Sequence, residues 1–190
     1  MLVTSSIPCV RGTAVFGLKA ATEELWGPLG LRDVTYRLPR VPRRALMEEI
    51  VMPQAWIPET HLIDFCRCVW EGPAQQVESA YTTFLGRAAF HGFGRFQKII
   101  LSFTSPQAIA VRVPSLWRRD HTHGELEADV TKGGCVLRLR DHPYVETEFS
   151  RGLLAETFRQ VMTFTRLGAK EVRMRHAPDT RAALLVHLSW

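Results

Sequence analysis

The densest group of side chains able to bind a metal or move a proton lies in the sequence RRDHTHGELE, residues 118–127. On a β-strand, alternate residues share a face, so His121 and His123 would project together and Glu125 would continue the row. Two imidazoles on one face are the beginning of a zinc or iron site, which needs further ligands. His142, in the sequence RDHP, is the best candidate for the next ligand.

A His-x-His pair alone is a weak motif, because an exposed junction between two strands produces the same pattern. Gly124 permits a turn at this point. We therefore expect an exposed junction and no metal, and we keep a metal site at His121, His123 and His142 as the alternative. The sequence contains no Gly-x-Ser-x-Gly and no His-Glu-x-x-His, and Asp141 and His142 would point to opposite faces of a strand. No enzyme is predicted.

Cys66 and Cys68, in FCRCVW, lie on a predicted helix. Residues two apart point about 200° apart around a helix, so the two thiols cannot chelate one metal. They are also too close in sequence for a relaxed disulfide. Buried, unreactive thiols are expected, and a redox-active or acylated cysteine is the alternative.

A short basic run, RLPRVPRR, contributes Arg37, Arg40, Arg43 and Arg44. Guanidinium groups bind phosphate in a bidentate manner, so this run could contact a phosphate or an acidic partner. Only Tyr36 supplies an aromatic ring nearby, and no nucleic-acid motif surrounds the run. We expect a solvated loop and no nucleic-acid binding.

Aromatic residues are the most informative apolar set. Most should belong to the core, but an apolar cavity between a helix layer and a sheet would have to be lined by such side chains. The pocket candidates are Trp56, Phe65, Trp70, Tyr81, Phe84, Phe90, Phe158 and Phe164. Trp117 and Trp190 are expected on neighbouring strands, in the core or on a dimer surface.

The first half of the chain, about 1–105, is predicted to be helical. Helical spacing and the positions of proline and glycine place its helices. They are expected over 18–25 with a stop at Gly27-Pro28, after Pro42, over PETHLIDFCRCVWEG, over about 74–90, and in a further piece reaching Phe103.

The second half, about 106–190, is predicted to be rich in strands. The expected strands are AIAVRVPSLW, GELEADV, CVLRLR, KEVRMRHA and AALLVHLSW, with a hairpin turn at Lys132-Gly133-Gly134 and an amphipathic helix capped by Gly168. Together the halves predict a single two-layer α+β domain over 1–190. In it, a mostly antiparallel sheet of about five strands packs against about five helices.

Bulk properties limit the classes of protein. The chain has 190 residues, a formal net charge of +5 and 4 cysteines. The N-terminus lacks the pattern of a secretory signal, and no apolar run approaches the length of a spanning helix. Four cysteines without a disulfide framework favour a reducing compartment, so a cytoplasmic protein is expected.

Several phrases resemble a known family: VPSLWRRDHTHGELE, VLRLRDHPYVET, TRLGAKEVRMRHA and ALLVHLSW. They resemble a bacterial paralogous family of unknown function. That family is in turn similar to the fold group of four-vinyl reductases, haem–nitric-oxide-binding domains and TRAPP small subunits. The resemblance implies an antiparallel sheet covered by helices, and an apolar cavity that binds small hydrophobic ligands or cofactors. Haem-binding relatives carry Tyr-x-Ser-x-Arg, which is missing here, as is the cysteine pattern of zinc-binding relatives, so neither haem nor structural zinc is expected and the cofactor stays unknown.

These observations lead to three functional hypotheses. The first is a non-enzymatic ligand-binding or signalling domain with an apolar pocket between helices and sheet, acting as a homodimer. The second is a protein–protein adaptor with a fully packed core. The third is a metalloprotein or enzyme that uses the histidines between residues 121 and 142.

Overall fold

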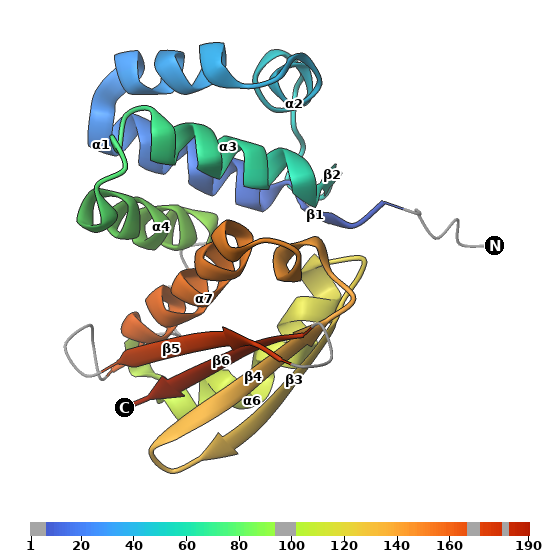
Figure 1. The fold of residues 1–190 in the computed structure, drawn as a ribbon, viewed down its shortest axis with the longest axis vertical. Helices are drawn as coiled ribbons and strands as arrows, with labels where there is room; N and C mark the ends of the chain where they lie inside the picture. The colour runs from blue at the N-terminus through green and yellow to red at the C-terminus, as the bar shows by residue number, and fades with distance from the viewer. Residues whose placement is uncertain (1–6, 94–101, 167–171, 180–182) are drawn as a thin grey trace. The chain divides into compact units, whose positions relative to one another are not determined.

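The structure is a computed structural model that describes residues 7–93, 102–166, 172–179 and 183–190 (Figure 1). The chain divides into two compact units. The N-terminal unit is Cys9–Phe93, and the C-terminal unit comprises Gly94–Trp190 together with Met1–Pro8. A single domain over 1–190 stays a prediction.

The N-terminal unit consists of helices and one short two-stranded antiparallel sheet, β1-β2. Its elements are β1 (Cys9–Arg11), α1 (Thr13–Arg37), α2 (Arg40–Arg43), the π-helix η1 (Arg44–Glu48), β2 (Trp56–Pro58), α3 (Glu59–Glu71) and α4 (Glu78–Gly92). The short helix expected after Pro42 thus begins slightly earlier, with α2, and continues as η1.

Helix α1 is longer than predicted. The expected stop at Gly27-Pro28 is a kink, where Gly27 has φ 65° and ψ −172°, and the helix resumes beyond it. Glycine adopts this left-handed conformation without a steric penalty. Proline suits the first turn of a helix, because its missing N–H would have no partner there. The same dipeptide that ends one helical segment therefore starts the next.

Helices α1 and α4 pack closely at Gly17. A Cβ atom at Gly17 would lie 2.3 Å from the carbonyl oxygen of Ala88, so only glycine permits this approach. The close packing accompanies an aromatic contact further along α1, where the rings of Trp26 and Phe84 are 5.9 Å apart. This pair belongs to the core of the N-terminal unit.

Helices α3 and α4 form where the helical spacing of apolar residues predicts helices. The predicted helix α3 is confirmed, and Leu62, Phe65 and Val69 are all buried on one of its faces. Helix α4 begins at Glu78 and not near residue 74, since Gln75 and Gln76 adopt positive φ values of 51° and 58° and form a turn.

The C-terminal unit alternates helices with hairpins. Its described elements are α6 (Pro106–Asp120), β3 (Glu125–Thr131), β4 (Gly134–Arg140), the 3-10 helix η2 (Pro143–Val145), α7 (Glu148–Thr163), β5 (Arg173–Pro178) and β6 (Leu184–Ser189). The helical piece predicted to reach Phe103 falls mostly on residues 94–101, outside the described residues, although Ser102 and Phe103 are helical; the Gly168 cap also falls outside the described residues.

The strand predicted over AIAVRVPSLW is wrong, because this segment is helix α6. The Ser105 side chain caps the helix by accepting a hydrogen bond from the Ala108 N–H at 3.2 Å. Ile109, Val113 and Trp117 are buried at a spacing of four residues, which is the helical repeat. Trp117 therefore lies on a helix and not on a strand beside Trp190.

The sheet has the strand order β3-β4-β6-β5, with every pair antiparallel. The predicted hairpin is confirmed, because Thr131 pairs with Gly134 and leaves Lys132 and Gly133 as the turn. The predicted strands CVLRLR and AALLVHLSW are also confirmed, as β4 and β6. The buried face of the two central strands carries Cys135, Leu137, Leu139, Leu184, Val186 and Leu188.

Helices α6 and α7 cover this buried face, α6 against β3 and β4 and α7 against β5 and β6 (Figure 1). On α7, Leu153, Phe158 and Met162 are buried, whereas Phe149 and Val161 are half-buried. The α+β class with an antiparallel sheet is confirmed. The main sheet has four described strands instead of about five, because α6 replaced the first one. No described helix is long and apolar enough to cross a bilayer.

Candidate functional site

His142 is a buried histidine directly after β4, with 4% of its surface exposed. Asp141 precedes it with a positive φ of 53°, which turns the chain out of the strand. The His142 Nδ1 accepts a hydrogen bond from the backbone N–H of Tyr144 at 3.3 Å. The two rings stack, with centroids 4.9 Å apart and an interplanar angle of 18°. The ring of His142 is therefore held on one side by Tyr144.

His121 is the first residue after α6, and its ring is held by Trp117, one turn earlier. The two rings stack with centroids 3.7 Å apart and an interplanar angle of 4°. The indole N–H of Trp117 donates to the carbonyl oxygen of His123 at 3.0 Å, and the indole also makes a T-shaped contact with His142, with ring centroids 4.9 Å apart. Trp117 thus orients both imidazoles.

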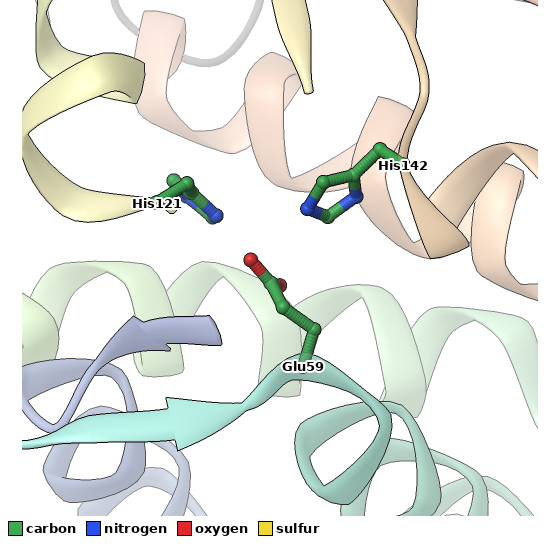
Figure 2. A group of neighbouring side chains, drawn as sticks. All are labelled: Glu59, His121 and His142. Atoms are coloured by element: carbon green, nitrogen blue, oxygen red, sulfur yellow. The ribbon is translucent and has the colours of Figure 1, made fainter. Parts of the chain in front are cut away.

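The rings of His121 and His142 approach each other at a centroid distance of 5.8 Å. Their facing ring nitrogens lie within 4.8 Å of one another. Figure 2 shows the two imidazoles turned toward each other, from the end of α6 and from the segment after β4; Glu59, also labelled there, begins α3 of the N-terminal unit. We call Trp117, His121, His142 and Tyr144 the imidazole cluster.

The structure thus brings together two of the three histidines considered from the sequence. The strand expected to align His121 and His123 does not form, because α6 ends at Asp120 and β3 begins only at Glu125. Gly124, with φ 84°, turns the chain between them. The ring of His123 is hydrogen-bonded to the Thr122 hydroxyl at 2.8 Å.

The sequence interpretation missed Trp117 and Tyr144 as parts of this group. Once the segment before His121 is taken as a helix, a tryptophan four residues earlier falls on the same face and offers a stacking surface. The second signal is the tyrosine two residues after His142. Both residues stand in the sequence close to a histidine, but their role could be inferred only after the helix before His121 and the turn at His142 had been predicted correctly.

The hydrogen bond at His142 Nδ1 determines the tautomer of the neutral ring. A neutral imidazole has one N–H and one lone pair. Because Nδ1 accepts from Tyr144, the neutral ring carries its proton on Nε2. The His142 Nε2 then carries the N–H of the ring.

The eight aromatic pocket candidates divide between the units. Phe158 and Phe164 belong to the C-terminal unit and the other six to the N-terminal unit. Within the N-terminal unit, Tyr81 contacts Trp70 at 5.2 Å and Phe84 at 5.9 Å between ring centroids. Phe65 is fully buried in α3 and Phe90 is half-buried at the end of α4. The indole of Trp56 is 42% exposed and lies beneath the Arg11 guanidinium at 3.7 Å. A pocket lined by these residues stays a prediction.

The four arginines of the basic run are mostly paired within the chain. Arg37 binds Asp33 at 2.9 Å, Arg44 binds Glu49 at 2.9 Å and Arg43 approaches Glu48 at 3.6 Å. Arg40 is exposed. An anion at this run would have to compete with these carboxylates, which weakens the anion-contact hypothesis.

All four cysteines are buried, and none of them forms a disulfide. Burial raises the pKa of Cys68 to about 11 and that of Cys135 to about 12, and it raises the pKa of Cys66 further, above the ordinary range. A thiol that stays protonated is a poor nucleophile. The arrangement fits the expected unreactive thiols.

No family model matches the sequence, and neither does any curated protein. Solved structures do match. They include an oxygen complex of an H-NOX domain related to soluble guanylate cyclases, with a TM-score of 0.62, 11% identity, and 94% of each chain covered. An H-NOX protein from S. oneidensis in the Fe(II)NO state has a TM-score of 0.62 at 8% identity, covering 94% of this chain and 98% of the other. The unliganded Fe(II) H-NOX protein from K. algicida gives 0.59 at 7%, covering 94% and 95%.

These matches establish that the chain shares the fold of H-NOX domains. The resemblance to the haem–nitric-oxide-binding group is confirmed at the level of the fold. The resemblance to a bacterial family of unknown function finds no support in the family models.

Proposed function

We propose that this chain is a non-enzymatic ligand-binding domain that serves signalling. The observation that carries the proposal is the likeness, over nearly the whole chain, to H-NOX domains described in oxygen-bound and Fe(II)NO-bound states. Fold alone does not determine function, so the ligand must be argued from the residues of this chain.

Haem in the manner of those relatives does not fit these residues. The resemblance implies a Tyr-x-Ser-x-Arg run, in which arginine suits the haem carboxylates. The tyrosine of the imidazole cluster, Tyr144, is followed by Glu146 and Glu148 at the two corresponding positions. Both glutamates are exposed, and a carboxylate repels another carboxylate. We therefore derive no step through haem.

These residues support the binding of a small ligand that is not haem. The imidazole cluster holds two imidazole rings against the flat aromatic surfaces of Trp117 and Tyr144, so it combines polar ring nitrogens with apolar walls. Small-molecule sites commonly combine apolar walls with a few oriented polar groups. Homodimer formation and the aromatic pocket remain part of this proposal.

An adaptor with a packed core is the alternative, and one observation favours it. Phe65 and Phe84 are fully buried, and the aromatic rings of the N-terminal unit contact one another directly. Residues that fill a core in this way leave less room for a ligand.

Mass spectrometry of the full chain purified from cells distinguishes the two. Under native conditions we expect mass beyond that of the chain, which disappears on denaturation and gives no haem absorbance. The mass of the chain alone, as monomer or dimer, would refute ligand binding and favour the adaptor. A haem absorption band would contradict the argument from Glu146 and Glu148.

A transition metal at His121 and His142 is a second candidate, favoured by the approach of their ring nitrogens to within 4.8 Å. Two nitrogens bound to one zinc are at most about 4.2 Å apart, twice the bond length, and the two ring nitrogens approach each other on the same scale. Binding at His142 Nε2 would also move its proton to Nδ1 and cost the hydrogen bond from Tyr144. That loss amounts to about 1 kcal/mol, which a metal–imidazole bond offsets.

Titration with Ni²⁺ or Zn²⁺ tests this candidate. His121→Ala and His142→Ala should each abolish stoichiometric binding, whereas His123→Ala, which removes an imidazole outside the cluster, should leave it unchanged. Equal loss in all three variants, or no stoichiometric binding by the unaltered protein, would eliminate the metal site.

A further inference from the structure

The outer face of the four-stranded sheet contains a hollow of about 410 Å³. This volume falls within the roughly 300–1,000 Å³ of small-molecule sites. The face lies opposite the one covered by α6 and α7, because its residues alternate with the buried ones along each strand. The hollow shares no residue with the imidazole cluster.

The strand register explains which residues form the hollow. Arg175 of β5 pairs with His187 of β6, which pairs with Val136 of β4, so these three side chains stand in one row across the sheet. Arg173 and Ser189 form the neighbouring pair in the next row. Side chains in adjacent rows on one face are about 6.6 Å apart, so both guanidinium groups reach the same space.

Arg173 and Arg175 give this wall of the hollow its positive charge. Among the residues that the structure describes, no ion pair joins Arg173 or Arg175 to a carboxylate, in contrast to Arg37, Arg43 and Arg44 of the basic run. Asp129, the acidic residue that lines the hollow, stands on β3 at the far side of the sheet. Three strand spacings, about 14 Å, separate β3 from β5.

Gly134 lines the hollow without adding a side chain to it. A Cβ atom there would lie 2.3 Å from the carbonyl oxygen of Leu188, so no larger residue fits without a backbone shift. Val136 adds an apolar surface beside it, and the Ser189 and Thr131 hydroxyls supply hydrogen-bonding groups.

We propose that this hollow binds a small organic molecule bearing a phosphate group. The phosphate lies between Arg173, Arg175 and His187, and the organic part covers Val136 and Gly134. Two guanidinium groups and an imidazole provide charge-assisted hydrogen bonds of the kind that phosphate recognition uses. The proposal is independent of the proposed function, because it uses a separate site.

The test is calorimetric titration of the full chain with phenyl phosphate and, separately, with inorganic phosphate, at constant ionic strength. We expect one saturable site for phenyl phosphate. Arg175→Gln and Arg173→Gln should each weaken it about tenfold or more, as expected for the loss of a charge-assisted hydrogen bond. Arg175→Lys, which keeps the charge but not the planar fork, should weaken it less.

Arg112→Gln is the matched control, because Arg112 is an exposed arginine of α6 outside the hollow. It should change the affinity by no more than about twofold, since a distant surface charge acts only through a screened field. Inorganic phosphate binding as tightly as phenyl phosphate would still support an anion site but assign it to the free ion. No binding of either probe, equal weakening in Arg112→Gln, or an Arg175→Gln effect on oligomeric state alone would overturn the proposal. Circular dichroism of each variant confirms that it is folded.

Discussion

Replacing Gly17 by alanine should destabilise the N-terminal unit, although alanine is the better helix former. The propensity gain is about 1 kcal/mol. Against it stands the new Cβ atom, which would lie 2.3 Å from the Ala88 carbonyl oxygen. A backbone oxygen cannot rotate away, so α1 and α4 must separate, and overpacking of this kind costs about 2–3 kcal/mol. The net loss is about 1–2 kcal/mol, or roughly 2–8 °C in Tm for a chain of this size.

Gly152→Ala provides the matched control with the opposite sign. Gly152 is also a helical glycine, within α7, but its nearest contact to an added Cβ atom would be the His176 Nε2 at a comfortable 3.9 Å. Only the propensity gain remains, so Tm should rise by roughly 2–4 °C. Thermal unfolding followed by circular dichroism measures both variants. If Gly17→Ala were as stable as the unaltered protein, the close approach of α1 and α4 would be incorrect.

Three further predictions concern the C-terminal unit and the thiols. Trp117→Phe removes the indole donor to the His123 carbonyl and should lower the free energy of unfolding by about 1–2 kcal/mol in urea denaturation; an unchanged midpoint would show that this hydrogen bond contributes nothing. Thr147→Ala removes the cap of α7 and should cost about 1 kcal/mol in the same assay, with a loss near zero arguing against the cap. Burial raises the pKa of Cys68 to about 11 and of Cys135 to about 12 from an ordinary 9.0. The folded state therefore holds more protons, stability should fall as the pH rises from 9 towards 12, and fast thiol labelling of the folded chain at pH 8 would contradict this burial.

The strands were predictable from the sequence where one face is buried and the other solvated. Along β4, Cys135, Leu137 and Leu139 alternate with residues that face outward, and the pattern gave both the strand and its hairpin partner. An amphipathic helix does not produce an alternation of period two, so the strand could be assigned without knowledge of its tertiary contacts.

Helix α6 could not be identified in the same way. Its sequence combines β-branched residues with Pro114, both of which disfavour a helix locally. The helix forms because Ile109, Val113 and Trp117 bury one stripe against the sheet and because Ser105 and Pro106 start it well. Packing overrode local propensity, and sequence alone does not contain that packing.

The candidate site was likewise predictable only in part. His121 and His142 were considered together from the sequence, but their approach depends on where α6 ends and on the turn at Asp141. The stacking of Trp117 on His121 required the helix that the sequence interpretation lacked. The hollow on the outer face depends on the pairing of β5 with β6, which brings Arg175 beside His187 across two segments of the chain.

The strand order β3-β4-β6-β5 leaves β3 and β5 as the edges of the sheet, and an edge strand is a template on which another chain can aggregate. Exposed Glu127 and Asp129 stand along β3, and exposed Arg173 and Arg175 along β5. Two copies meeting β3 to β3 would place acid beside acid, and two meeting β5 to β5 would place arginine beside arginine, which is destabilising in either case. The arginines that give the hollow its charge therefore also oppose the growth of the sheet by addition of a second chain at the same edge.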